Sequence, residues 1–315
     1  EKNLKGNFTL QVDYRLQDGT LADSRSAKVK VSGGTVYGEY LAGGFEFSVD
    51  NPGYSRVEAR LLRGGETVCE GSDEVFSVKL DASGISSEGS VADSSGRVSA
   101  FLSSLGIHPA EYVSGTPSGD YLVVGQFEPQ QWGSGMSDIM EWVYKGHTLI
   151  VIDKPERWAE FFADKEVLDY RGSKKIGTAW YGGNYFNRAH PVWNGLPQDC
   201  VFNWEYQCFS AYNRRRIGLR CENGETLAAA VADHKKEVYS VLSLVRAGRG
   251  QVIFTSLDIP ACISDIHAPS QESLRAGDVV DGMYEALGTF DVSGENGANV
   301  VGQQLLLNMM KIKNL

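Results

Sequence analysis

Two different sequence patterns meet at Asp81-Ala82-Ser83-Gly84-Ile85-Ser86-Ser87-Glu88-Gly89-Ser90, a segment with too few large apolar residues to build a core. Before this segment, apolar and polar residues alternate in short runs. After it, continuous apolar runs are separated by segments with the period of a helix. The change of pattern predicts two domains of different class, residues 1–81 and 93–315, joined by a linker over residues 82–92.

The first domain is predicted to be an antiparallel β-sandwich of immunoglobulin-like type. Phe8, Leu10, Val12 and Tyr14 alternate with polar residues, as in a half-buried strand. Glycine-rich turns separate the further runs, which cover Ala27–Val31, Phe45–Val49, Ser55–Leu62, Glu66–Cys69 and Glu74–Leu80. Such sandwiches serve as spacers, docking modules or sugar binders, and no cluster of aromatic residues favours the last role.

The second domain is predicted to be of α/β class with a mixed sheet. Tyr121–Gly125 and Thr148–Ile152 are continuous apolar runs, typical of strands buried on both faces of a parallel sheet. Helical stripes flank them at 98–105, 136–143 and after Pro155. Later strands at 217–220, 226–232, 238–245 and 251–256 are joined by hairpin turns, so part of the sheet is antiparallel. A closing helix covers residues 298–312.

Composition excludes several classes of function. The chain has 315 residues, 42% of them hydrophobic, and a net charge of -10, which argues against nucleic acid or an anionic membrane as partner. No apolar stretch approaches the roughly 20 residues of a membrane-spanning helix. The five cysteines form no Cys-x-x-Cys pair, so we expect no metal site. A strand pattern begins by residue 7, from which we infer a cut within a longer polypeptide.

Catalytic residues are hard to assign. Glu128, Asp153 and Asp258 follow predicted strands, at the edge where ligands bind in open α/β sheets. Three acids around one crevice could handle protons, but acids also cap helices, and we favour capping. Gly125-Gln126-Phe127-Glu128 is not a glycine-rich phosphate loop, and no nucleophile elbow is present. We therefore expect no cofactor and assign no catalytic residue.

The least usual composition lies in residues 180–212, where aromatic side chains mix with amides and cations. Such a mixture suits sugar rings, but also a docking surface or a core beneath a long loop, and we favour docking or core. The candidate binding or docking residues are Trp180, Tyr181, Tyr185, Arg188, His190, Trp193, Trp204 and Tyr206.

Five segments together resemble a known family: Asp73–Val78, Asp93–Arg97, Tyr121–Gly125, His190–Pro197 and Gly248–Phe254. Nearly the whole chain is similar to the C-terminal accessory region of bacterial glycoside hydrolase family 2 proteins, the β-galactosidase-like enzymes. The second domain resembles the flavodoxin-like fold of class I glutamine amidotransferases. It lacks their cysteine elbow and their His-x-Glu pair, so the resemblance does not imply that activity.

The resemblance implies a non-catalytic region of a periplasmic or extracellular hydrolase. This region would brace or dock on the catalytic barrel of its parent polypeptide, or form a contact between copies of the protein. One alternative is a carbohydrate-binding module that uses the aromatic side chains of residues 180–212 to hold an oligosaccharide. A weaker alternative is an independent hydrolase, which requires Glu128, Asp153 and Asp258 to converge in one pocket.

Overall fold

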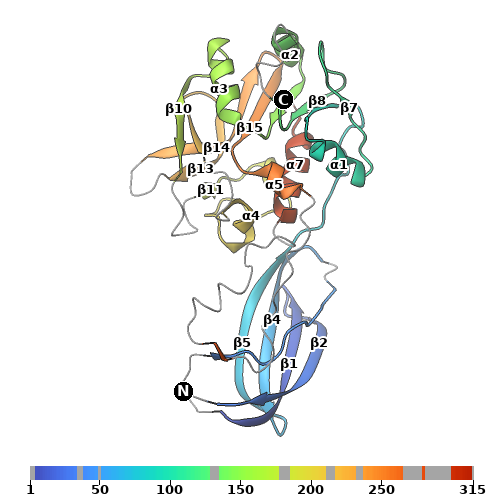
Figure 1. The fold of residues 1–315 in the computed structure, drawn as a ribbon, viewed down its shortest axis with the longest axis vertical. Helices are drawn as coiled ribbons and strands as arrows, with labels where there is room; N and C mark the ends of the chain where they lie inside the picture. Colours follow the sequence, from blue (N-terminus) through green and yellow to red (C-terminus); the bar gives the residue numbers. More distant parts are fainter. Residues whose placement is uncertain are drawn as a thin grey trace. The chain divides into compact units, whose positions relative to one another are not determined.

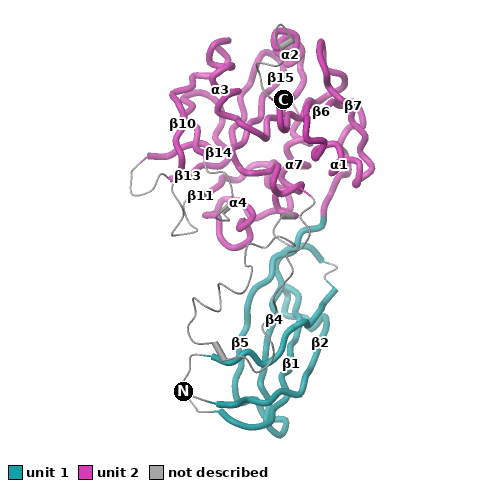
Figure 2. Tube along the Cα trace, in the orientation of Figure 1, with its two compact units in different colours: residues 1–79, 267–295 teal, residues 80–266, 296–315 magenta. Residues whose placement is uncertain are grey.

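The computed structural model describes residues 4–33, 38–48, 51–127, 135–176, 185–210, 217–231, 237–264, 279–280 and 299–313. These residues are mostly β-sheet, with one mixed sheet and few helices. They divide into two compact units (Figure 2): unit 1 comprises residues 1–79 and 267–295, and unit 2 comprises residues 80–266 and 296–315. The chain therefore passes from one unit to the other three times, after residues 79, 266 and 295.

Unit 1 contains a four-stranded antiparallel sheet in the order β2-β1-β4-β5 (Figure 1). Alternation separates its faces: Phe8, Val29 and Leu61 are buried in one cluster, whereas Asp13 lies on the other face in an ion pair with Arg60. The pair β3–β16 completes the described strands of this unit. The strands are β1 (Gly6–Leu16), β2 (Leu21–Val31), β3 (Gly38–Glu39), β4 (Gly53–Arg63), β5 (Glu66–Ser77) and β16 (Val279–Val280).

Two predicted strands of unit 1 differ from the structure. Strand β5 is continuous from Glu66 to Ser77, because it pairs with β4 along its whole length and the polar residues in its middle face solvent. Residues 45–48 are in no strand, and Val49 lies outside the described residues. This segment contacts the sheet through side chains, since Phe47 stacks on Tyr14, and not through a backbone ladder.

Unit 2 is built on a mixed sheet in which β7, β6, β8, β9 and β15 lie side by side in that order and run parallel. Beyond β15 the sheet is antiparallel: β14 pairs with β15, β12 and β13, β12 with β10, and β13 with β11. The strands are β6 (Ser90–Ala92), β7 (Ala110–Glu111), β8 (Tyr121–Val124), β9 (Thr148–Val151), β10 (Tyr170–Lys175), β11 (Tyr185–Asn187), β12 (Ile217–Cys221), β13 (Glu225–Val231), β14 (Val238–Ala247) and β15 (Gly250–Thr255).

Both faces of this sheet are covered, as the apolar runs predict. In β9, Leu149 belongs to a cluster with Trp142 of α2 and Phe162 of α3, while Ile150 points to the opposite face, where α7 contacts the strand. No described helix is long and apolar enough to cross a membrane. The helices are α1 (Arg97–Ser104), α2 (Gly135–Tyr144), α3 (Pro155–Asp164), η2 (Pro191–Trp193), η3 (Trp204–Tyr206), α4 (Gln207–Ser210), α5 (Ile259–Cys262) and α7 (Asn299–Lys311).

Strand β6 differs from the sequence-based expectation, which placed residues 82–92 in a linker. Ser90, Val91 and Ala92 are fully buried and pair in parallel with β7 on one side and β8 on the other. The polar side chain of Ser90 is tolerated inside the sheet, between β7 and β8, because its hydroxyl donates a hydrogen bond to the carbonyl of Ser118 at 2.9 Å.

Helix α7 is held in unit 2 by buried amide side chains. Asn308 donates from Nδ2 to the carbonyls of Val192 at 2.9 Å and Asn194 at 2.8 Å. Its Oδ1 accepts from Gln304 Nε2 at 2.8 Å, and Gln304 Oε1 accepts from the backbone N–H of Asp81, also at 2.8 Å. The helix thereby joins the start of unit 2 to the turn that contains η2.

Candidate functional site

The parallel sheet of unit 2 has one switch point, where successive strands stop being added on one side and begin to be added on the other. β7 lies on one side of β6 and β8 on the other, so the connections after β6 and β8 leave in opposite directions. Loops part at the carboxyl ends of such strands, which is where open α/β sheets bind ligands. A hollow of about 130 Å³ lies there. Its lining residues are Asp93, Ser95, Arg97, Val98, Gly125, Gln126, Asp153, Pro260 and Ile263.

Asp93, the first residue after β6, is one of the two acids that line this hollow among the described residues. One carboxylate oxygen accepts from Ser95 N at 3.2 Å, Ser95 Oγ at 2.7 Å and Gln126 N at 3.0 Å. The other accepts from the backbone N–H of Val98, in the first turn of α1, at 2.9 Å. This carboxylate therefore satisfies backbone donors at a helix start and ties the loop after β6 to the loop after β8.

Gly125 permits the close approach of these two loops. A Cβ atom at this position would lie 2.8 Å from Cγ of Asp93 and 2.9 Å from its Oδ1. Ser94 adds a second link, because its backbone N–H and its hydroxyl both donate to the carbonyl of Gln126, at 3.1 and 2.7 Å. The loops that follow β6 and β8 are therefore held together by hydrogen bonds beside the hollow.

The three predicted strand-end acids do not all reach this hollow. Asp153 follows β9, lines the hollow and is half-buried. Asp258 is absent from the lining and caps α5, accepting from the backbone N–H of Ala261 at 3.3 Å. Glu128 lies outside the described residues. Asp93 was not among the predicted site acids, because the short strand before it lies within the predicted linker.

The aromatic segment forms an interior cluster. Tyr185, Trp193 and Tyr206 are 3%, 0% and 1% exposed and surround Phe202, with ring centroids 5.9, 5.8 and 4.1 Å from its own. A sugar or a partner protein cannot reach rings that are already covered. The burial of these three residues agrees with core packing, which was one of the readings favoured from the sequence.

The other candidates of this segment have separate surroundings. Arg188 is exposed and forms an ion pair with Glu225, with 3.2 Å between Nη2 and Oε1. Trp204 is half-buried at the start of η3. Trp180 and Tyr181 lie outside the described residues. Within the described ranges, no group of three or more His, Cys, Asp or Glu side chains is placed to hold a metal ion, and no disulfide joins the cysteines.

His190 caps η2, because its Nδ1 accepts from the backbone N–H of Val192 at 3.1 Å. Burial lowers the pKa of His190, the cations Arg188 and Arg246 lower it further, and Glu225 opposes them. The unfolded chain therefore binds this proton more tightly than the folded chain does.

The free energy of unfolding should consequently fall as the pH drops below about 6.5, the ordinary pKa of histidine, and through the lowered pKa of the folded state. We expect His190→Asn, which keeps an acceptor at the cap, to lose this part of the pH dependence. Urea unfolding of both proteins between about pH 5 and 7 tests the expectation. Equal slopes of stability against pH in the two proteins would contradict it.

Comparison with known proteins gives little guidance. No family model matches the chain, and no curated protein does. Among solved structures, the exo-β-1,4-mannosidase Op5Man5 from Opitutaceae bacterium strain TAV5 matches with a TM-score of 0.32 and 15% sequence identity. The match covers 52% of this chain and 26% of that chain, so it spans about a quarter of the mannosidase. A likeness at this TM-score carries no argument about fold or function.

Proposed function

We propose that this chain is a non-catalytic accessory region of a larger glycoside hydrolase. The observation that carries the proposal is the bonding of Asp93. At the sheet edge where an α/β enzyme keeps its reactive groups available, this carboxylate accepts four hydrogen bonds from the loops that surround it. Asp258, at the end of another strand, is likewise used as a helix cap. Acids held in this way stabilise a scaffold and are poorly placed to transfer protons.

The proposal includes a finer assignment of the two units. The parallel strands of unit 2 lie in the order β7-β6-β8-β9-β15, which is second, first, third, fourth and fifth along the chain. That order is the one of flavodoxin-like sheets and supports an amidotransferase-like domain. For unit 1, the antiparallel sheet with one apolar and one polar face supports one layer of an immunoglobulin-like sandwich.

The proposed role is to brace the catalytic barrel of the parent polypeptide, or to form a contact between copies of the protein, in the periplasm or outside the cell. The family resemblance supports this role. The rival role of a carbohydrate-binding module in residues 180–212 is disfavoured by the burial of Tyr185, Trp193 and Tyr206. The rival role of an independent hydrolase is disfavoured because Asp258 lies outside the hollow that Asp153 lines.

The first test is an assay of the purified chain on 4-nitrophenyl β-galactoside, β-glucoside and β-mannoside. We expect no release of nitrophenol above that of buffer. Release that Asp153→Asn abolishes would contradict the proposal, because Asp153 is the strand-end acid that lines the hollow with Asp93. Release unaffected by this variant would point to a contaminating enzyme, which a second purification removes.

The second test compares the proposed whole hydrolase with the same enzyme lacking this region. A bracing role predicts a lower Tm for the shortened enzyme, with aryl-glycoside activity retained below that temperature. An unchanged Tm and an unchanged oligomeric state would together contradict bracing and contact between copies.

A further inference from the structure

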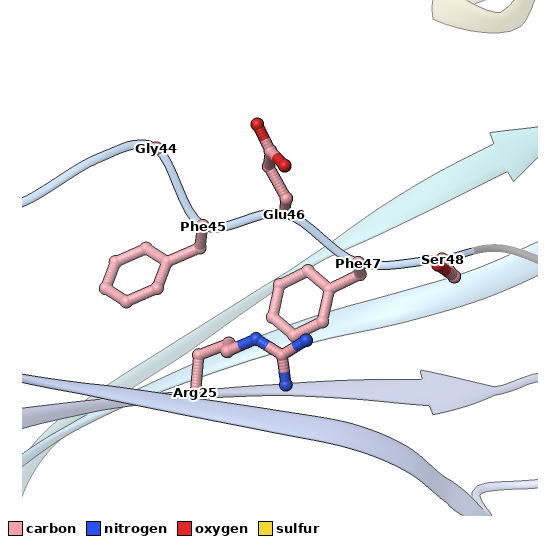
Figure 3. Close-up of a pocket in the computed structure, with 6 residues that line it drawn as sticks. All are labelled: Arg25, Gly44, Phe45, Glu46, Phe47 and Ser48. Carbon is pink, nitrogen blue, oxygen red and sulfur yellow. The ribbon is translucent and has the colours of Figure 1, made fainter.

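A second hollow, of about 480 Å³, is lined by described residues of unit 1 (Figure 3). It is lined by Arg25 of β2 and by the segment Gly44–Ser48. Its volume falls within the range of roughly 300–1,000 Å³ that small-molecule sites occupy. Sequence reasoning missed it, because Phe45 and Phe47 were assigned to a strand and Arg25 lies about twenty residues away along the chain.

One wall of the hollow is fixed by contacts within the chain. The ring of Phe47 stacks on Tyr14 of β1, with centroids 5.8 Å apart, and the guanidinium carbon of Arg25 lies 5.6 Å from the centroid of Phe47. Arg25 is itself held by an ion pair with Asp23 and by donation from Nη1 to the carbonyl of Ser24 at 3.2 Å. A ligand would therefore meet a preformed surface, which lowers the cost of binding.

Phe45 supplies an open aromatic face beside this wall. It lies two residues before Phe47 in extended chain, and Figure 3 shows both rings on the side of the segment where Arg25 lies, with the guanidinium beneath the ring of Phe47. Among the described residues, the half-buried ring of Phe45 has no aromatic or cationic partner. A partly accessible π-face without such a partner suits the C–H face of a pyranose ring.

Polar groups complete the hollow. Nε and Nη2 of Arg25 donate to no described residue, and the exposed carboxylate of Glu46 accepts from none. In Figure 3 the Glu46 side chain points to the other side of the segment, away from the rings, so Arg25 is the polar side chain that lies beside the rings. The remaining N–H groups of this guanidinium are able to donate hydrogen bonds to the hydroxyl oxygens of a sugar.

The charged side chains at the hollow favour neutral over acidic sugars. Among the described residues that line the hollow, Arg25 is the only cation, and the carboxylates of Glu46 and of Asp23, which pairs with Arg25, outnumber it, so an acidic sugar would be repelled. We propose that this hollow binds one neutral pyranose ring of an oligosaccharide, stacked on Phe45 and hydrogen-bonded by Arg25. The choice of a sugar as ligand class rests on the proposed role in a glycoside hydrolase.

The test is isothermal titration of the chain with neutral gluco-, xylo-, manno- and galacto-oligosaccharides. We expect saturable binding of at least one of them, weakened about tenfold in Phe45→Leu, which keeps apolar volume but removes the aromatic face. Phe186→Leu is the matched control, because Phe186 is an exposed aromatic residue of unit 2, 36% exposed, and should leave the affinity unchanged. Circular dichroism checks that both variants are folded.

A second arm uses an oligosaccharide that carries a glucuronate in place of one neutral unit. We expect weaker binding of the acidic sugar by the natural chain and a smaller difference in Glu46→Gln. No saturable binding of any neutral oligosaccharide, equal affinity in Phe45→Leu, or preference for the acidic sugar would each overturn the inference. None of these outcomes affects the hydrolysis assay, so the inference and the proposed function fail separately.

Discussion

Asn308→Leu should lower the free energy of unfolding of unit 2 by about 2–4 kcal/mol. Leucine keeps the volume of the side chain, so the loss comes from hydrogen bonding and not from a cavity. The buried carbonyl of Val192 and the Nε2 group of Gln304 each lose a partner, and an unsatisfied buried polar group costs about 1–3 kcal/mol. The carbonyl of Asn194 loses its bond as well but lies at an exposed residue.

Tryptophan fluorescence during urea unfolding is the suitable measurement, because all six tryptophans lie within residues 80–266 of unit 2. The matched control is Lys311→Ala on the same helix. Lys311 forms an ion pair with Asp81 at 2.7 Å, and both side chains are partly exposed, so its removal should cost less than about 1 kcal/mol. Equal losses in the two variants would show that the buried amides do not hold α7 as described.

Gly302→Ala should also change the free energy of unfolding strongly. Helix propensity and overpacking act on it in opposite directions. Helix propensity favours alanine over glycine by at most about 1 kcal/mol here, because that is the value for a helix interior and Gly302 lies in the first turn of α7. Against this, a Cβ at position 302 would lie 2.5 Å from Sγ and 2.6 Å from Cβ of Cys262, and 3.3 Å from Phe209. Cys262 and Phe209 are fully buried, so neither side chain can move into solvent to relieve these contacts. We expect overpacking to win, with a net loss of about 2–3 kcal/mol.

A double-mutant cycle with Cys262→Ala isolates the clash. Removing Sγ relieves the shorter contact, so Gly302→Ala should cost less in the Cys262→Ala background than in the natural chain. The readout is again the tryptophan transition in urea. A stabilising effect of Gly302→Ala in the natural chain would mean that α7 and α5 separate easily, and would contradict the close packing of these helices.

Periodicity predicts those elements whose burial is decided by their own residues. Thr148–Ile152 is apolar throughout, and strand β9 covers Thr148–Val151 with both faces buried. Val98, Phe101 and Leu102 recur at helical spacing and are the buried residues of α1. In both cases the side chains that define the pattern also form the contacts, so local sequence carries enough information.

Strands that depend on pairing with segments elsewhere in the sequence could not be predicted in this way. Ser90-Val91-Ala92 is short and begins with a polar residue, and it becomes a strand only because β7 and β8 pair with its two edges. Residues 279–280 pair with β3 some 240 positions earlier in the chain, and no local pattern indicates this partner. Residues 45–48 show the reverse case, since their alternation is that of a strand but no described strand pairs with them.

The same distinction applies to the candidate sites. Acids at strand ends can be selected from sequence, but which of them share a hollow depends on loop geometry. Asp153 lines the hollow with Asp93, whereas Asp258 turns back to cap its own helix. Aromatic composition likewise marks residues 180–212 as unusual without indicating that Tyr185, Trp193 and Tyr206 face inward. Exposure is a property of the assembled core and not of the segment.

The threefold passage of the chain between the units constrains how the protein is made on the ribosome. The strands β1, β2, β4 and β5 all lie within residues 6–77 and pair mainly with neighbours in sequence, so their sheet is able to form early in synthesis. Unit 2 must wait, because α7, which contributes Leu305, Leu306 and Met309 to its interior, is translated after residues 267–295. Until α7 is made, the face of the unit 2 sheet that this helix covers lacks its cover. We therefore expect chaperones that recognise apolar surfaces to bind the nascent chain.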